Sequence, residues 1–179
     1  KFQDKNKSLK LLVLRKKGNI SQGRNFAIKS AKNSIILCTD SDCILEKDWV
    51  KNISEPFKNR KAEVVSGFYH PSGDSVFVNF LGTYTSVMLD KVDKKSYLPS
   101  SRSVAFRKSS WQKVGGYPQW LDRGEDLYFA RNLKEKKLNF VFMENAIVFW
   151  PQRKNIFQAF KQFFGYAKGD AQAHFIRDQ

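Results

Sequence analysis

Two carboxylates stand two residues apart in the tripeptide Asp40-Ser41-Asp42, directly after the apolar run SIILCT at 34–39. Such a run is typical of a buried strand, and open α/β sheets bind ligands beyond the carboxyl ends of their strands. If the backbone is extended there, both side chains point the same way. Hard oxygen ligands of this kind suit Mg²⁺ or Mn²⁺, with phosphate oxygens and water completing the coordination shell. The alternative is a solvated acidic turn, because the pattern is short.

A second acidic pair, Glu125-Asp126, follows Gly124 at the expected start of a helix over 125–137. Free backbone N–H groups and the helix dipole favour carboxylates there, so the pair has a structural explanation as a helix cap. The functional interpretation is a general base that accepts a proton from a reacting group. Both interpretations can hold together.

Two further segments carry polar side chains that could contact a ligand. In Ser100-Ser101-Arg102, the guanidinium of Arg102 could clamp a phosphate with two hydrogen bonds, or form only a surface ion pair. On an expected helix over 155–168, Gln162 and Tyr166 lie four residues apart and therefore share a face. The simpler interpretation of that helix is an aromatic core face with a polar outer side.

Hydrophobic periodicity predicts the elements that position these residues. The expected strands are 9–14, 34–39, 62–69, 103–106, 140–143 and 146–149, and the expected helices are 22–32, 47–58, 75–90, a short helix capped by Ser109 or Ser110, 125–137 and 155–168. Ser21 is the expected cap of the first helix. Strands that alternate with helices indicate an α/β fold with an open, mainly parallel sheet flanked by helices.

The composition is that of one folded domain with a strong positive charge. The chain has 179 residues, of which 41% are hydrophobic, so intrinsic disorder is excluded. A formal charge of +15 attracts polyanions such as nucleic acid, anionic lipid headgroups or a phosphorylated small substrate. The two cysteines, Cys38 and Cys43, suit a reducing compartment and neither a disulfide scaffold nor a zinc site. No run reaches the ~18 apolar residues of a membrane-spanning helix.

In their order and spacing, these segments resemble family 2 glycosyltransferases with the GT-A fold. The similarity runs through GNISQGRNFAI, IILCTDSD, VVSGFY, LPSSRSVAFRKSSWQKVGGYP, GEDLYFARNLKEK, AIVFWPQR and FKQFFGYAKGD, over nearly the whole chain. The resemblance implies one GT-A-like (Rossmann-like) domain over 1–179. Within it, 1–70 would be the nucleotide- and metal-binding half, 71–150 the acceptor and catalytic half, and 151–179 the C-terminal helix.

The resemblance also implies a reaction and its residues. A sugar would pass from a nucleotide-diphosphate sugar to a hydroxyl of a glycan or lipid-linked acceptor, with inversion at the anomeric carbon. Mn²⁺ or Mg²⁺ would be held by Asp40 and Asp42, with Asp42 the more direct ligand. Asp126 would be the catalytic base, with Glu125 beside it. The implied nucleotide-sugar-binding residues are Arg24, Asn25, Asp40, Arg102, Gln162 and Tyr166.

Two features depart from the family pattern. Relatives begin with a strand carrying an apolar-Pro-x-Tyr-Asn signature and a second strand whose acidic end binds the nucleobase. Both would lie upstream of Lys1, so we expect an N-terminally truncated domain. Many relatives also have a metal-binding histidine at the position of Trp150-Pro151, and His174 is the candidate replacement, whereas a lone histidine such as His70 is more simply structural or exposed.

The positive charge would favour an anionic donor and peripheral contact with an anionic membrane that carries a lipid-linked acceptor. The expected location is cytoplasmic, at the inner face of the cell membrane, in the synthesis of cell-envelope polysaccharide. Two alternatives remain open. A basic nucleic-acid-binding module would use the charge and the exposed aromatic residues, but it leaves both carboxylate pairs unexplained, so we expect no specific nucleic acid partner. A non-catalytic, truncated transferase domain would only bind partners.

Overall fold

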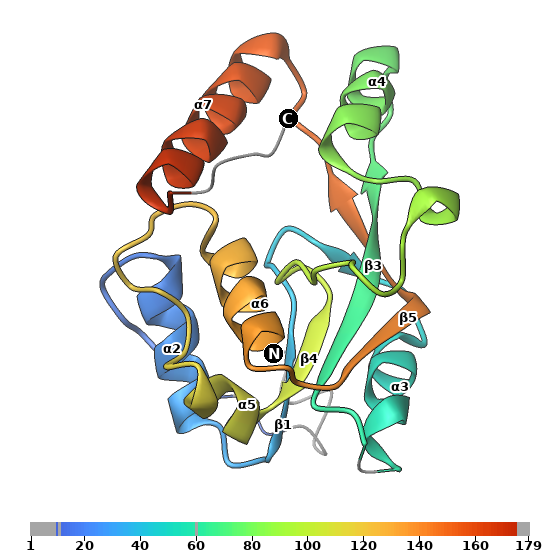
Figure 1. Ribbon diagram of the computed structural model, residues 1–179. Helices are drawn as coiled ribbons and strands as arrows, with labels where there is room; N and C mark the ends of the chain where they lie inside the picture. Colours follow the sequence, from blue (N-terminus) through green and yellow to red (C-terminus); the bar gives the residue numbers. More distant parts are fainter. Residues whose placement is uncertain (1–9, 11, 60, 175–179) are drawn as a thin grey trace.

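The computed structural model describes residues 10, 12–59 and 61–174 (Figure 1). Its strands are β1 (Ile35–Cys38), β2 (Ile44–Leu45), β3 (Val64–Ser72), β4 (Val104–Arg107) and β5 (Phe140–Pro151). Its helices are α2 (Ile20–Ser30), α3 (Trp49–Ser54), α4 (Val76–Thr85), α5 (Lys108–Lys113), α6 (Glu125–Glu135) and α7 (Ile156–Gln172), with 3₁₀ turns η1 (Glu55–Phe57) and η2 (Leu89–Lys91).

The described strands form one sheet in the order β1-β4-β3-β5-β2. Strand β4 pairs antiparallel with both β1 and β3, β2 pairs antiparallel with β5, and the pairing of β3 with β5 is parallel. The expected α/β class is confirmed, but the sheet is mixed rather than mainly parallel. The reason is that β4 inserts between β1 and β3, which themselves run in the same direction.

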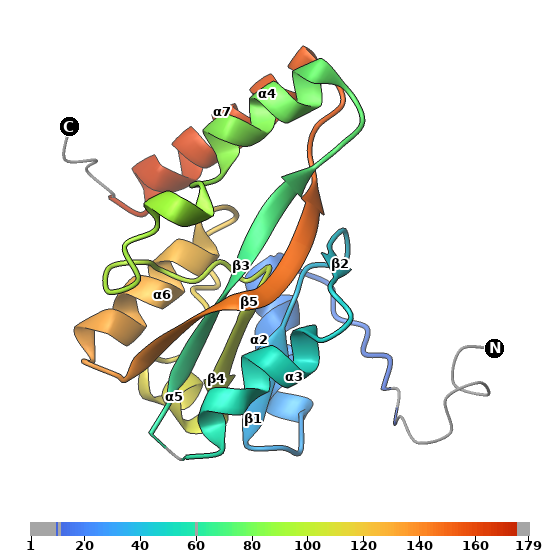
Figure 2. The same cartoon turned by 90° about the vertical axis from the view of Figure 1, so that its right-hand side faces the viewer.

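Alternating side chains of the strands build a core on each face of the sheet. On one face Val64, Val104 and Phe106 pack with α2 and α6. On the other face Val65 and Ala105 pack with α3 and η1. In Figure 2, β3 and β5 extend beyond this layer and lead to α4 and α7. The sheet therefore carries helices on both faces, and a separate pair of helices, α4 and α7, lies farther along β3 and β5.

Several expected boundaries are corrected. Asn19, not Ser21, caps α2: its side-chain Oδ1 accepts a hydrogen bond from Gln22 N, and the Gln22 side-chain Oε1 accepts one from Asn19 N. No side chain caps α5, so Ser109 and Ser110 have no such role. The runs 140–143 and 146–149 form the single strand β5, which pairs along β3.

Two helices, α4 and α7, differ in length from the expected ranges. Helix α4 ends at Thr85, because Ser86 adopts an extended conformation, and only the short turn η2 follows. Helix α7 continues beyond the expected end to Gln172. Of the expected strand 9–14, residues 10 and 12–14 are not in a strand, and the others lie outside the described residues. No helix in the described part of the chain has the length and apolar character needed to cross a membrane.

Candidate active site

Arg24 joins the two acidic segments. Its guanidinium donates a hydrogen bond from Nη1 to Oε1 of Glu125 at 2.5 Å, and a second one from Nη2 to Oδ1 of Asp40. Arg24 lies on α2, Asp40 follows β1, and Glu125 is the first residue of α6. The ion pairs therefore hold the carboxyl end of β1 beside the N-terminus of α6, which brings both carboxylate motifs to one place.

The start of α6 depends on Gly124. Its φ of 76° is in the left-handed region, which glycine adopts without a steric penalty, and it turns the chain sharply into the helix. The Glu125 side chain that follows is buried, and this burial, with the neighbouring Asp126, raises the pKa of Glu125 above its ordinary value. The attraction of Arg24 acts in the opposite direction but does not cancel the rise.

Asp126 faces the loop before β4. Its Oδ2 accepts a hydrogen bond from Ser100 Oγ at 3.0 Å and a longer one from Ser101 N at 3.4 Å. Its Oδ1 accepts one from Leu127 N at 2.9 Å. The N-cap of α6 is Gly124 and no side chain caps the helix, so the predicted capping role of the acidic pair is not found. Ser100 and Ser101, from the loop before β4, orient the half-buried carboxylate of Asp126. Such an orientation is what a general base requires.

Arg102 lies on the other side of Ser100. Its guanidinium carbon is 3.7 Å from the ring centroid of Trp150 and 5.1 Å from that of Tyr69. Its Nη1 donates to Ser100 Oγ at 2.8 Å. Its Nε is buried and has no hydrogen-bond partner among the described residues. Two aromatic faces thus hold a cation beside the residue that contacts Asp126.

Helix α7 reaches this site through its polar side. Tyr166 Oη lies 3.5 Å from Nη2 of Arg102 and accepts a hydrogen bond from Gln162 Nε2 at 2.8 Å. The Gln162 Oε1 in turn accepts from Arg153 Nε at 2.9 Å. The expectation that Gln162 and Tyr166 share a face is confirmed. They form a chain of contacts from α7 to Arg102.

A glycine permits the close approach of α7. A Cβ atom at Gly169 would lie 2.4 Å from the carbonyl oxygen of Arg123, next to the Gly124 turn. That distance is far below van der Waals contact, so only glycine fits while the helix keeps its place. The position of Tyr166 therefore depends on this backbone-to-backbone packing.

The side chain of Asn25, a predicted nucleotide-sugar-binding residue, contacts the loop around Tyr117. Its Nδ2 donates to Tyr117 O at 2.8 Å, and its Oδ1 accepts from Tyr117 N at 2.9 Å and from Trp111 Nε1 at 3.0 Å. The amide is thus committed to the buried loop around Tyr117. Its neighbour Arg24 points to the acidic residues, because adjacent residues on a helix face different directions.

The candidate metal ligands are Asp40 and Asp42. They lie on a tight turn in which Cys43 N donates to Asp40 O at 3.1 Å. The side chain of Asp42 is exposed, whereas Asp40 shares one oxygen with Arg24. Two carboxylates, completed by phosphate oxygens and water, are a donor set that suits Mn²⁺ or Mg²⁺. Burial raises the pKa of the Cys43 thiol to about 11, so this thiol is protonated near neutral pH and is a poor ligand.

His174 does not join these carboxylates. It lies exposed just after α7 with a φ of 51°. Over residues 10, 12–59 and 61–174 there is no group of three or more His, Cys, Asp or Glu side chains that could hold a metal ion. His174 therefore lies outside any such group, and its role as a replacement for the family's histidine stays a prediction.

Sequence reasoning missed three contacts of the site. It did not pair Arg24 with Glu125, because nothing in either segment indicates which distant residue meets it. It did not connect Ser100 with Asp126 for the same reason. It also missed Tyr69 beneath Arg102, although Tyr69 stands at the end of an expected strand, where a ligand site was anticipated.

Comparisons with known proteins bear on the family and the fold of the chain. The model of glycosyl transferase family 2 matches residues 1–115. Among solved structures, the chain is similar to the mannosyltransferase PcManGT from Pyrobaculum calidifontis in complex with GDP-Man and Mn²⁺, with a TM-score of 0.66.

That structural match has 17% sequence identity and covers 89% of this chain but 45% of the other, so this chain spans less than half the length of that relative. At this identity the match supports the GT-A-like fold. No curated protein sequence matches the chain. The family match covers more than half of the chain and includes the Arg24 and Asp40 segments. The chain therefore belongs to glycosyl transferase family 2.

Proposed function

We propose that this domain transfers a sugar from a nucleotide-diphosphate sugar to an acceptor hydroxyl by a metal-dependent, inverting reaction. One observation supports this most directly: Arg24 holds the Asp40 turn next to Glu125, so the candidate metal ligands and the candidate base lie at one site. A nucleic-acid-binding module would not need this arrangement. Membership of family 2 supports the same class of reaction.

In this proposal Asp42 and Asp40 would hold Mn²⁺ or Mg²⁺. When bound, the metal neutralises the charge of the departing nucleoside diphosphate. Arg102 adds a second positive charge, since burial alone would lower its pKa but Tyr166, Tyr69 and the nearby carboxylates raise it overall. The guanidinium therefore stays charged and is available to a phosphate oxygen.

Asp126 is the proposed general base. The acceptor oxygen forms a bond to the anomeric carbon as the bond from that carbon to the diphosphate oxygen breaks, and the hydroxyl proton passes to the Asp126 carboxylate. Ser100 and Ser101 keep this carboxylate oriented by their hydrogen bonds to Oδ2. A single displacement of this kind inverts the configuration at the anomeric carbon.

The acceptor is proposed to be a glycan or a lipid-linked sugar. Release of nucleoside diphosphate tests the function: the purified protein is incubated with Mn²⁺ and a panel of guanosine and uridine diphosphate sugars, with and without a membrane extract as a source of acceptors. We expect metal-dependent release from one donor that increases when acceptors are added. Absence of release from every donor, with the protein shown to be folded, would contradict the proposal.

A further inference from the structure

Helix α7 is amphipathic, but its apolar side faces solvent. The side chains of Phe157 and Phe160 are 83% and 71% exposed, and Ile156 and Phe164 are also largely exposed. The side that packs on the protein is formed by Gln162, Tyr166 and Gly169. In a helix that only completes a soluble core, the apolar stripe faces inward.

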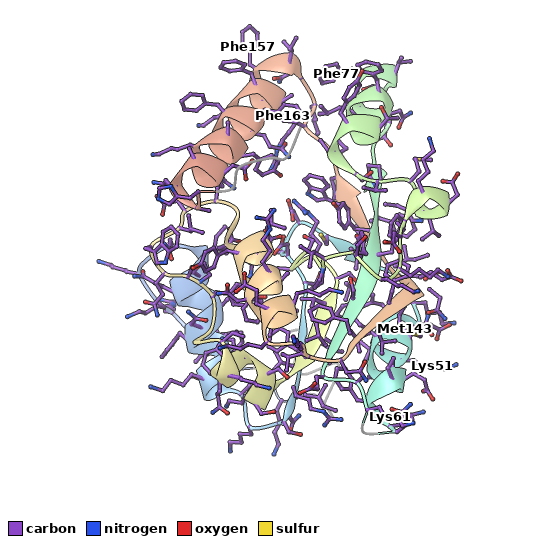
Figure 3. The ribbon with its side chains drawn as sticks, in the orientation of Figure 1. Lys51, Lys61, Phe77, Met143, Phe157 and Phe163 are labelled. Carbon is purple, nitrogen blue, oxygen red and sulfur yellow. The ribbon has the colours of Figure 1, made fainter. Side chains whose placement is uncertain are left out.

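Helix α4 contributes a second exposed apolar group at the same end of the molecule. Val76 is 88% exposed and Tyr84 is 70% exposed, and Phe80 packs against Tyr84 with its ring largely in solvent. Figures 1 and 2 both place α4 and α7 at this end, and Figure 3 shows Phe77 and Phe157 there. We name the following set the α4–α7 surface: Val76, Phe80, Tyr84, Ile156, Phe157, Phe160 and Phe164. Several large apolar side chains gathered in this way mark an interaction surface, unlike single exposed ones.

Exposed lysines flank the apolar side of α7. Lys161 and Lys168 on α7 are seven residues apart and both are exposed, so they lie along one line of the helix. The exposed Lys154 stands just before the N-cap residue Asn155. Lys161 follows Phe157 by four residues and Lys168 follows Phe164 by four, so each lysine is adjacent to an exposed phenylalanine. Between Ile156 and Gln172 the only acidic residue is Asp170.

We propose that the α4–α7 surface, with Lys161 and Lys168, binds the surface of an anionic membrane. Phenylalanines on one side of a helix and lysines beside them form the pattern of helices that lie in the membrane interface. The lysine stems lie along the apolar side while their ammonium groups reach anionic headgroups. This charge pattern favours an anionic bilayer over a second copy of the chain, which carries the same positive charge.

The reason why this domain would bind a membrane rests on the proposed function. Tyr166 on the inner side of α7 contacts Arg102, so the helix that lies on the membrane also contributes to the candidate active site. Binding through its outer side would place that site next to the bilayer, where a lipid-linked acceptor is found.

Vesicle sedimentation tests the proposal. The purified protein is mixed with vesicles of phosphatidylcholine alone or with an added third of phosphatidylglycerol, and the bound fraction is measured. We expect binding to the anionic vesicles, and at least about tenfold weaker partitioning for Lys161→Glu/Lys168→Glu. We expect a similar or larger loss for Phe157→Ser/Phe160→Ser/Phe164→Ser. The matched charge control is Lys47→Glu/Lys51→Glu, with Lys47 just before α3 and Lys51 within it, and this variant should bind as the parent does. Figure 3 shows Lys51 far from the α4–α7 end.

Equal binding by the parent and both α7 variants would overturn the proposal, and so would equal loss in the α3 control. A concentration-dependent dimer that the phenylalanine variant abolishes, without vesicle binding by the parent, would assign the surface to self-association instead. Thermal unfolding verifies that each variant is folded. Nucleoside diphosphate release in the absence of vesicles reports the proposed transferase activity separately, so failure of one account is distinguishable from failure of the other.

Discussion

The Nη1 atom of Arg24 lies 2.5 Å from Oε1 of Glu125, an ion pair between α2 and the first residue of α6. Glu125 is 7% exposed, so this pair is largely shielded from water. Because the same guanidinium also binds Asp40, loss of Arg24 would leave two carboxylates without their cation at one site. The geometry of the site therefore depends on a residue that does not need to take part in the chemistry.

The raised pKa of Glu125 predicts a pH dependence of stability. Above its ordinary value of 4.5, the unfolded chain loses the Glu125 proton before the folded chain does. The folded state then binds more protons, so the stability contributed by this group falls as pH rises through that interval. Glu125→Gln lacks the titration. We expect the melting temperature of the parent, minus that of the variant, to decrease from about pH 4 toward neutrality.

Thermal unfolding of both proteins across this pH range measures the effect. A difference that stays constant, or that grows with pH, would show that burial does not dominate at Glu125.

The packing of α7 predicts opposite effects for two glycine substitutions. Gly169→Ala places a methyl group against the Arg123 backbone, and we expect the free energy of unfolding to fall by about 1–3 kcal/mol. Gly165→Ala is the matched control, because its nearest neighbour is the flexible Arg123 side chain at 3.6 Å. Alanine is the better helix former, so this variant should be as stable as the parent or more stable by up to about 1 kcal/mol. Denaturant unfolding of both variants gives the comparison, and equal effects at the two positions would contradict the packing described.

Local signals predicted most elements of the fold, whereas their pairing depends on contacts between distant segments. The apolar runs located β1, β3 and β4 closely. The direction and place of β4 between two other strands could not be read from its four residues, and this gave the wrong expectation of a mainly parallel sheet.

In the candidate site, too, local signals predicted single residues, but not the contacts between distant segments. Asp40 and the Glu125-Asp126 pair were recognised from their spacing and position next to expected elements. The burial of Asn25 around Tyr117 depends on the packing of whole elements, which the sequence pattern does not contain. The aromatic side of α7 shows most clearly that periodicity predicts a helix but not which side of it is buried. Its periodicity predicted the helix correctly, but it also suggested a core face, while the phenylalanines are exposed.

The metal proposal predicts a specific loss of ligand stabilisation. Mn²⁺ together with the nucleoside diphosphate of the donor should raise the melting temperature of the parent, because a ligand that binds only the folded state stabilises it. Asp42→Ala should abolish this shift. Asp48→Ala is the control, since Asp48 is exposed nearby and makes no capping hydrogen bond. A shift that survives Asp42→Ala unchanged would rule out Asp42 as a metal ligand.

Turnover of Asp126→Asn tests the central claim most directly. Asparagine is nearly the same size as aspartate and its Oδ1 can still accept the Leu127 N–H bond, so the fold should be preserved, but it cannot take the acceptor proton. The account predicts that turnover falls by ~10²-fold or more while donor binding hardly changes, and that Asp122→Asn in the preceding loop retains parental turnover. An Asp126→Asn protein with turnover within about threefold of the parent would contradict the assignment of Asp126 as the base.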